Sequence, residues 1–194
     1  MLTEHSTRSA DTRTKILEAA FQILARQGYE NTSIKDIAEE AGVAQGLVHY
    51  HFKSKQQLVL AVLAEVCREM EFGDAQGAAG AQAAYEKFKN MLKGSQATHA
   101  LYIQLIAMGL HDKELGAGVL SFVRQDRAHI EDIARQVLAE READPKPARA
   151  IASVIEAAVL GIMVQNLIDP EFNAEEAVDA LNAMSLSAVF AEEK

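Results

Sequence analysis

Apolar residues recur at helical spacing along most of the chain. Between Thr12 and Gln27 the apolar positions fall on one stripe of period 3.6 residues, formed by Ile16, Leu17, Ala20, Phe21 and Leu24. Similar patterns predict further helices over about 32–41, 44–51, 55–72, 82–93, 96–110, 118–142, 146–168 and 173–191. No strand alternation persists, so we expect an all-α fold of about nine helices.

Capping signals mark where several of these helices begin. Thr32 or Ser33 can accept a bond from the first free N–H groups of the second helix, and Ser54 with Gln57 fits a capping box for the fourth. Gly28 and Gly42 suit the turns that end the first and second helices.

The C-terminal half carries similar signals. Asp144-Pro145 offers an N-cap followed by a proline at the first helical position, and Asn173 with Glu176 caps the last helix. The glycine-rich run over 73–80 is the weakest helical stretch, and we predict a flexible connection there.

Composition points to a soluble protein in a reducing compartment. The chain has 194 residues, 49% of them hydrophobic, and its single cysteine, Cys67, cannot form an internal disulfide. The N-terminal 15 residues lack the apolar core of a secretory signal. Residues 150–168 hold one charge, Glu156, and approach the length of a membrane span; we favour a buried interface helix. We therefore expect a cytoplasmic protein without a membrane segment.

Charge is distributed unevenly. The net charge of −9 lies wholly in residues 61–194, because residues 1–60 hold seven basic and seven acidic side chains. The run 41–64 has no acidic residue but contains Lys53 and Lys55. Such a run is typical of a surface that faces phosphates, and equally of chance.

The window over 32–55, TSIKDIAEEAGVAQGLVHYHFKSK, is the most informative. Ala38 is small where two short helices would touch, and Gly42 supplies the turn four residues later. Val43 and Val48 then offer apolar anchors. This spacing indicates a helix-turn-helix, in which the second helix enters the major groove of DNA.

Residues 12–58 resemble the DNA-binding domain of TetR-family repressors. The matching runs are ILEAAFQILARQGYENTSI, DIAEEAGV and VHYHFKSKQQL. The last is similar to the family's signature Leu-Tyr-x-His-Phe-x-x-Lys; it has Val48-His49 where the family often has Leu-Tyr, and keeps Tyr50, His51, Phe52 and Lys55. The resemblance implies a three-helix helix-turn-helix domain over 1–54, with a flexible arm over 1–10, and a larger ligand-binding and dimerisation domain over 55–194.

The expected DNA face combines the resemblance with chemistry. Tyr50 and Lys55 are implied phosphate contacts, the alternatives being a core tyrosine and a solvated lysine. Gln45 and Leu47 lie early enough in the recognition helix to reach base edges. The full set of predicted DNA-binding residues is Thr32, Ser33, Gln45, Gly46, Leu47, His49, Tyr50, His51 and Lys55.

Two further groups of residues bear on this face. Arg8, Arg13 and Lys15 can let the N-terminal arm touch DNA, or can form a solvated tail. His49 and His51 make a poor metal pair, because positions two apart on a helix point away from each other. We expect no metal site.

The rest of the chain offers no catalytic constellation, so we expect neither an enzyme nor a cofactor. The resemblance implies a cavity for a small-molecule effector inside the helical domain, although each candidate wall residue also suits an ordinary core. The candidates are Met70, Phe72, Tyr85, Phe88, Met91, Tyr102, Leu105, Met108, Phe122, His129, Glu156, Met163 and Gln165.

The last two helices are apolar over more than one face, which favours partners on both sides. The resemblance implies a homodimer with a four-helix interface, and a two-fold dimer favours a near-palindromic operator. The predicted interface residues are Ile151, Val154, Ile155, Ala158, Ile162, Val178, Leu181 and Met184.

Together these features favour a repressor that leaves a palindromic double-stranded DNA operator when a small, largely apolar effector binds. The alternatives are an all-helical carrier or enzyme with a vestigial helix-turn-helix, and a module that binds another regulator.

Overall fold

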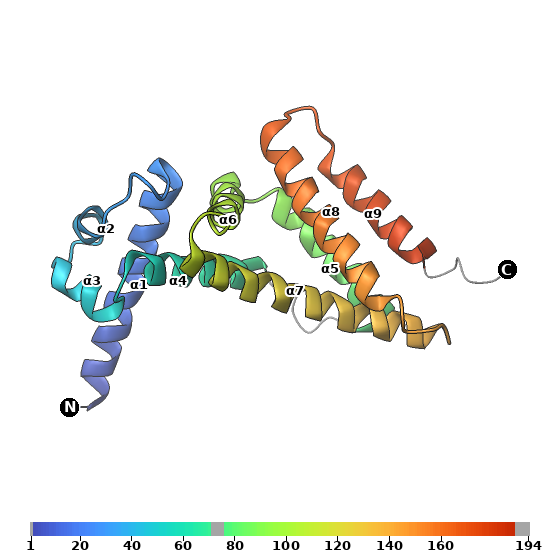
Figure 1. The fold of residues 1–194 in the computed structure, drawn as a ribbon, viewed down its shortest axis with the longest axis horizontal. Coiled ribbons are helices and arrows are strands. Elements are labelled where there is room, and N and C mark those ends of the chain that lie inside the picture. The colour runs from blue at the N-terminus through green and yellow to red at the C-terminus, as the bar shows by residue number, and fades with distance from the viewer. Residues whose placement is uncertain (1, 71–75, 189–194) are drawn as a thin grey trace. The chain divides into compact units, whose positions relative to one another are not determined.

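The computed structural model describes the backbone of residues 2–70 and 76–188 and the side chains of residues 10–68 and 76–185. Within these ranges the chain forms nine α-helices and no strand, as predicted (Figure 1). They are α1 Leu2–Gln27, α2 Ile34–Glu40, α3 Gln45–His51, α4 Lys55–Met70, α5 Gly77–Leu92, α6 Gln96–Met108, α7 Lys113–Glu140, α8 Ala148–Ile168 and α9 Ala174–Ala188.

The helices form two compact units. The first comprises Met1–Glu69 and Ala100–Val119, and the second comprises Met70–His99 and Leu120–Lys194. Helices α6 and α7 each contribute residues to both units. The functional division at residue 54 stays a prediction.

The core of the first unit is built on the apolar stripe predicted for α1. Ile16, Ala20 and Leu24 are fully buried, and Ile37 of α2 and Leu58 of α4 are buried with them. Burying a side chain of the size of leucine or isoleucine contributes about 1.5–3 kcal/mol. The stripe therefore holds the small N-terminal helices together.

The cap of α2 settles the choice between Thr32 and Ser33. The Ser33 hydroxyl oxygen accepts the Asp36 backbone N–H at 3.1 Å, and the Asp36 carboxylate accepts the Ser33 backbone N–H at 2.9 Å. These hydrogen bonds lower the pKa of Asp36. Helix α1 ends at Gln27, as predicted, but begins at Leu2 rather than near Thr12.

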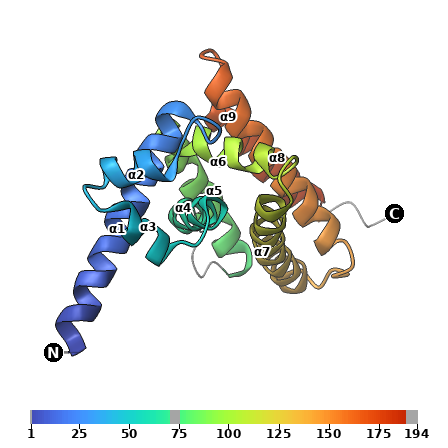
Figure 2. The same ribbon diagram turned by 60° about the vertical axis from the view of Figure 1, so that its left-hand side comes forward.

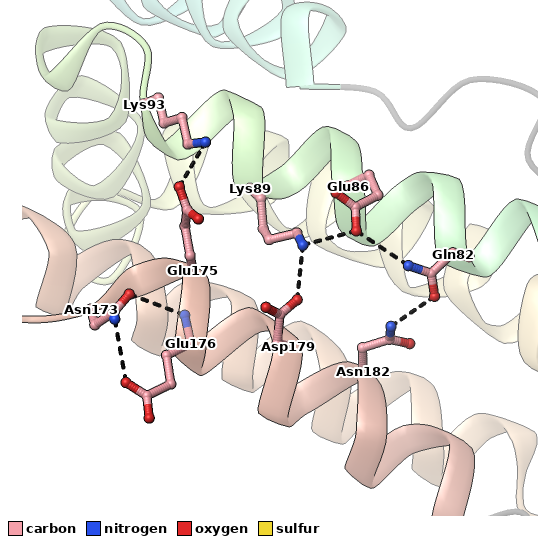
Figure 3. Close-up of polar contacts among 9 residues, drawn as sticks. All are labelled: Gln82, Glu86, Lys89, Lys93, Asn173, Glu175, Glu176, Asp179 and Asn182. Atoms are coloured by element: carbon pink, nitrogen blue, oxygen red, sulfur yellow. Dashed lines mark hydrogen bonds and ion pairs between the residues drawn. The ribbon is translucent and has the colours of Figure 1, made fainter.

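In the second unit a ladder of polar contacts joins α5 to α9 (Figure 3). Lys89 lies between Glu86 and Asp179, with its Nζ 2.8 Å from a carboxylate oxygen of each. One turn towards the end of α5, Lys93 pairs with Glu175 at 2.6 Å. The carboxylates beside Lys89 raise its pKa well above the ordinary range. The ladder fixes the register of α5 along α9.

The start of α5 corrects part of the predicted flexible connection over 73–80, of which residues 73–75 lie outside the described residues. Residues 77–80 are helical, because side chains of α7 satisfy the first backbone N–H groups of α5. Gly77 N–H donates to the Gln136 side-chain oxygen at 2.7 Å, and Ala78 N–H donates to a Glu140 carboxylate oxygen at 2.9 Å. Gly77 also takes a positive φ of 60°, which glycine adopts without strain.

Two other helix starts differ from prediction. α8 begins at Ala148 rather than behind Asp144-Pro145, because the Asp144 carboxylate accepts the Lys146 N–H at 2.9 Å in a turn before the helix. α7 begins at Lys113 rather than near Gly118, because the Asp112 carboxylate accepts the backbone N–H groups of Glu114 and Leu115. The predicted cap of α9 is confirmed: Asn173 accepts the Glu176 N–H at 3.1 Å.

Helix α8 is the one helix among the described residues that is long and apolar enough to cross a membrane. Only 22% of its most apolar 18-residue window is buried within the chain. Val154 and Ile168 are 65% and 74% exposed. The helix thus presents an apolar face that this single chain leaves uncovered.

His99 predicts a dependence of stability on pH. Its side chain is 2% exposed and its Nδ1 has no hydrogen-bond partner among the described residues, so desolvation lowers its pKa below the ordinary 6.5. The unfolded chain therefore binds the proton first. The contribution of His99 to the free energy of unfolding is fully present above pH 6.5, its pKa in the unfolded chain. It is lost as the pH falls towards the lower pKa of the folded chain, by at most about 1.4 kcal/mol per pH unit.

Urea unfolding between pH 7.5 and pH 5 measures this effect. We expect His99→Leu to flatten the pH dependence, whatever it does to absolute stability. His111→Leu is the matched control, because His111 is exposed. An equally steep dependence in His99→Leu would contradict the prediction.

Candidate nucleic-acid interface and ligand cavity

The turn between α2 and α3 has the close packing that the sequence predicted. Ala38 is 3% exposed, and its carbonyl accepts the Val43 N–H at 3.0 Å. Gly42 adopts a φ of 63°, in the left-handed region that favours glycine. This turn sets α3 at an angle to α2, and both lie beside α1 (Figure 2).

Helix α3 is anchored at one residue. Val48 is fully buried, and Phe52, directly after the helix, is 5% exposed. The remaining positions face away from the core: Gln45, Gly46, Leu47, His49 and Tyr50 are exposed, and His51 is half-buried. Tyr50 has 77% of its surface exposed, which excludes the alternative of a core tyrosine.

Lys55 opens α4 and is already engaged within the first unit. Its Nζ donates to the Tyr29 carbonyl at 2.5 Å and lies 3.8 Å from the centre of the Tyr29 ring. Partial burial lowers the pKa of Lys55, against the opposing charges of Glu30 and Asp36. An ammonium has three N–H donors, so this position leaves capacity for a phosphate.

Both predicted hydroxyl donors of the α2 start are used within the chain. Thr32 is 3% exposed, and its hydroxyl donates to the Gly28 carbonyl at 2.6 Å. Ser33 Oγ lies 2.7 Å from the Asp36 carboxylate, so it donates to that oxygen. A phosphate contact by either hydroxyl would have to replace these bonds.

The three basic residues predicted to bring the N-terminal arm to DNA differ in their surroundings. Arg13 stacks on Phe52, with its guanidinium carbon 5.4 Å from the ring centre, which brings a positive charge beside the end of α3. Lys15 is exposed. The side chain of Arg8 lies outside the described residues.

The second unit contains a cavity of about 80 Å³ between α5, α7, α8 and α9. Its walls are apolar except for two hydroxyls. The lining residues are Ala81, Ala84, Tyr85, Phe88, Ile130, Ile133, Ala134, Val137, Ile151, Ile155, Val159 and Ser185.

Sequence reasoning found part of this lining. Tyr85 and Phe88 were pocket candidates, while Ile151 and Ile155 had been assigned to the dimer interface. The α7 wall was missed, although its four residues follow the spacing 130, 133, 134 and 137, which marks one face of a helix.

The other pocket candidates whose side chains are described do not line the cavity. Met70 and Phe72 lie outside the residues whose side chains are described. The candidates with described side chains that are absent from the lining are Met91, Tyr102, Leu105, Met108, Phe122, His129, Glu156, Met163 and Gln165.

Three of these candidates carry polar side chains whose surroundings the structure describes. Glu156 is paired with Arg127, whose Nε lies 2.6 Å from its carboxylate. Gln165 is exposed. His129 has a buried Nε2 without a partner among the described residues. In the described part of the chain, no three His, Cys, Asp or Glu side chains gather to hold a metal ion.

The predicted interface residues fall into three groups by burial. Ile162, Val178 and Leu181 are buried within the chain, so they support the α8–α9 pair from inside. Val154 and Met184 are exposed, at 65% and 66%. Ala158 is half-buried, like the two isoleucines of the cavity wall.

Comparison with known proteins agrees with this geometry. Residues 16–62 match the model of "Bacterial regulatory proteins, tetR family". The chain is similar to the regulator YvkB of Bacillus subtilis, with 44% identity over 54 residues, and to the repressor KstR2 of Mycolicibacterium smegmatis, with 36% over 63. These segments cover 28% and 32% of this chain but only 29% and 31% of the relatives.

The likeness in fold extends further. The solved structure of GusR from Salmonella enterica matches with a TM-score of 0.79 over 93% of this chain and 96% of that one, at 20% sequence identity. Taken together, the family match identifies residues 16–62 as a helix-turn-helix segment of the kind found in regulators of the TetR family, and the likeness to GusR shows that nearly the whole chain shares the same all-helical fold.

Proposed function

We propose that this chain is a homodimeric repressor that binds a near-palindromic DNA operator and is released by a small, largely apolar effector. The observation that carries the proposal is α3, in which only Val48 is buried and five of seven residues are exposed. The name of the relative KstR2 supports repression. We propose a cytoplasmic location, where operator DNA lies.

The exposed side of α3 suits a major groove. Gln45 can bond adenine through both its amide atoms, and Leu47, 44% exposed, can meet a thymine methyl. Gly46 lets the backbone approach closely, and His49 can reach a base or a phosphate. Tyr50 then supplies a hydroxyl to the phosphate backbone.

The uncovered face of α8 supports a homodimer. An apolar face that includes Val154 and Ile168 costs free energy in water, and a second copy of the same face covers it by two-fold symmetry. A two-fold dimer presents two copies of α3 to successive major grooves, about 34–36 Å apart.

Helix α7 offers a path for the effector signal, because it belongs to both units. Its later turns line the cavity. In the first unit its opening turns pack tightly through glycines: Gly116 lies against the backbone of Gly109, and Gly118 against Leu60 of α4. An effector that binds one position of α7 more tightly than another shifts the equilibrium towards that position, and with it the positions of α4 and of α3, which precedes α4 in the chain.

Tyr50→Ala tests the DNA face. In a gel shift with DNA from upstream of the chain's own gene, we expect affinity to fall about tenfold or more, because an exposed contact to DNA is lost. Thermal stability should not change, since Tyr50 packs against little of the core. Leu110→Ala, at an 81% exposed position in the same unit, is the control. Undiminished binding by Tyr50→Ala would place the DNA face elsewhere.

Lys55→Gln tests the phosphate contact. A lysine that neutralises a phosphate releases about 0.9 of a counterion, so the slope of log affinity against log salt should shrink by about that amount. Lys35→Gln is the matched control, because Lys35 is an exposed lysine of α2. A weaker affinity with an unchanged slope would show that Lys55 acts only through Tyr29.

Val154→Asp tests the dimer. A carboxylate on the uncovered face of α8 should lie unpaired in the interface, and we expect sedimentation to show a shift to monomer at micromolar concentration. Leu120→Asp on α7, at a 46% exposed position, should leave the assembly unchanged. Equal sedimentation of wild type and Val154→Asp would argue against this interface.

A further inference from the structure

The cavity of the second unit has a single polar point. Tyr85 of α5 and Ser185 of α9 both line it, with their hydroxyl oxygens 2.8 Å apart. All ten other lining residues are alanine, valine, isoleucine or phenylalanine. The chemistry of an occupant is therefore set by apolar contact and by these two hydroxyls.

The register of the two helices holds this pair in place. Gln82 bonds Asn182 at 2.8 Å and Lys89 bonds Asp179 at 2.8 Å, on the polar side of α5 (Figure 3). Tyr85 lies between Gln82 and Lys89 in sequence, on the side that meets the cavity. The ladder therefore keeps the Tyr85 hydroxyl opposite Ser185.

The number of hydroxyl protons determines which residue donates in the hydrogen bond between Tyr85 and Ser185. The Ser185 hydroxyl lies 2.7 Å from the Leu181 carbonyl, which can only accept, so Ser185 spends its one proton there. Tyr85 must then be the donor in its bond with Ser185. Both protons are used, and what the Tyr85 oxygen still offers is acceptor capacity.

Charge on an occupant is disfavoured. Among the residues whose side chains are described, no carboxylate, ammonium or guanidinium lines the cavity, and Glu156, the one charged residue between positions 150 and 168, is paired with Arg127 outside it. Burial raises the pKa of Tyr85, so its phenol stays neutral. A charged group would lose its water without gaining a partner of opposite sign.

We propose that this cavity binds an uncharged, mainly hydrocarbon molecule that carries a hydrogen-bond donor, such as an alcohol, and that the donor bonds the Tyr85 oxygen. This inference rests on the proposed function only in taking the occupant to be the effector. At about 80 Å³ the cavity is smaller than the ~150 Å³ cavity that holds benzene, so an alicyclic occupant widens it.

A matched series of cyclohexane derivatives tests the proposal on the full-length protein by calorimetry. Cyclohexanol donates and accepts, cyclohexanone only accepts, and cyclohexanecarboxylate and cyclohexylammonium carry a charge. We expect cyclohexanol to bind about tenfold more tightly than cyclohexanone, because the ketone leaves two acceptors facing each other. The two ions should not bind measurably.

Two variants separate the proton assignment from mere loss of packing. Tyr85→Phe removes the phenol oxygen that accepts the occupant's proton and leaves only the Ser185 hydroxyl, so the preference for cyclohexanol over cyclohexanone should shrink. Ser185→Ala frees the Tyr85 proton, so the preference should move towards cyclohexanone. Ser153→Ala is the matched control, because Ser153 donates to the carbonyl four residues earlier on α8 but lies outside the cavity.

Each outcome decides the matter. Equal binding of alcohol and ketone by the wild type, tighter binding of either ion, or no binding of any probe would overturn the proposal. Operator binding is measured separately by gel shift. If cyclohexanol binds selectively but DNA affinity does not change, the cavity chemistry stands and the effector part of the proposed function fails. If the protein binds no operator, the calorimetric result is unaffected.

Discussion

A helix of seven residues does not hold its shape alone in water, and the proposed DNA-binding surface depends on one such helix, α3. Its stability comes from Val48, which is fully buried, and from Phe52 just after its end. The tight turn at Gly42 fixes the direction in which it leaves α2. Because so few residues anchor α3, nearly all of its side chains remain available to DNA.

The uneven distribution of charge explains how an acidic protein can present a surface suited to DNA. The acidic excess lies after residue 60, whereas the surface around α3 and the start of α4 holds no acidic residue from 41 to 64. Arg13 adds a cation beside Phe52, and Tyr29 holds the ammonium of Lys55 in position. Local charge, rather than the net charge of −9, governs the approach to phosphates.

The second unit separates polar from apolar contacts between the same helices. On α5, Lys89 and Lys93 reach carboxylates of α9, while Tyr85 and Phe88 turn into the cavity. The polar ladder determines register, and the apolar side provides room for a small molecule. Since Val154 and Ile168 of α8 are exposed while Ile151 and Ile155 line the cavity, one helical unit contains both a cavity and a candidate interface.

Local signals in the sequence were sound where one residue and its near neighbours decide the outcome. The cap at Asn173 and a cap at Thr32 or Ser33 are predictable, because a side chain and an N–H three residues away suffice, and the structure shows Ser33 to be the cap. The start of α5 was not predictable, because the groups that satisfy Gly77 and Ala78 belong to α7, about sixty residues later in the chain.

By itself, then, the sequence determined the all-helical class and the position of the helix-turn-helix, since periodicity and turn chemistry are local, whereas the exposure of Tyr50 on α3 was settled by the structure. Only the tertiary structure decided which apolar residues enclose the cavity and which remain uncovered. Ile151 and Ile155 carry the same pattern as Val154 yet line the cavity, while Val154 is exposed. The hydrophobic effect is not directional, so an apolar stripe in a sequence indicates that the residues need to be buried but does not identify the surface that buries them.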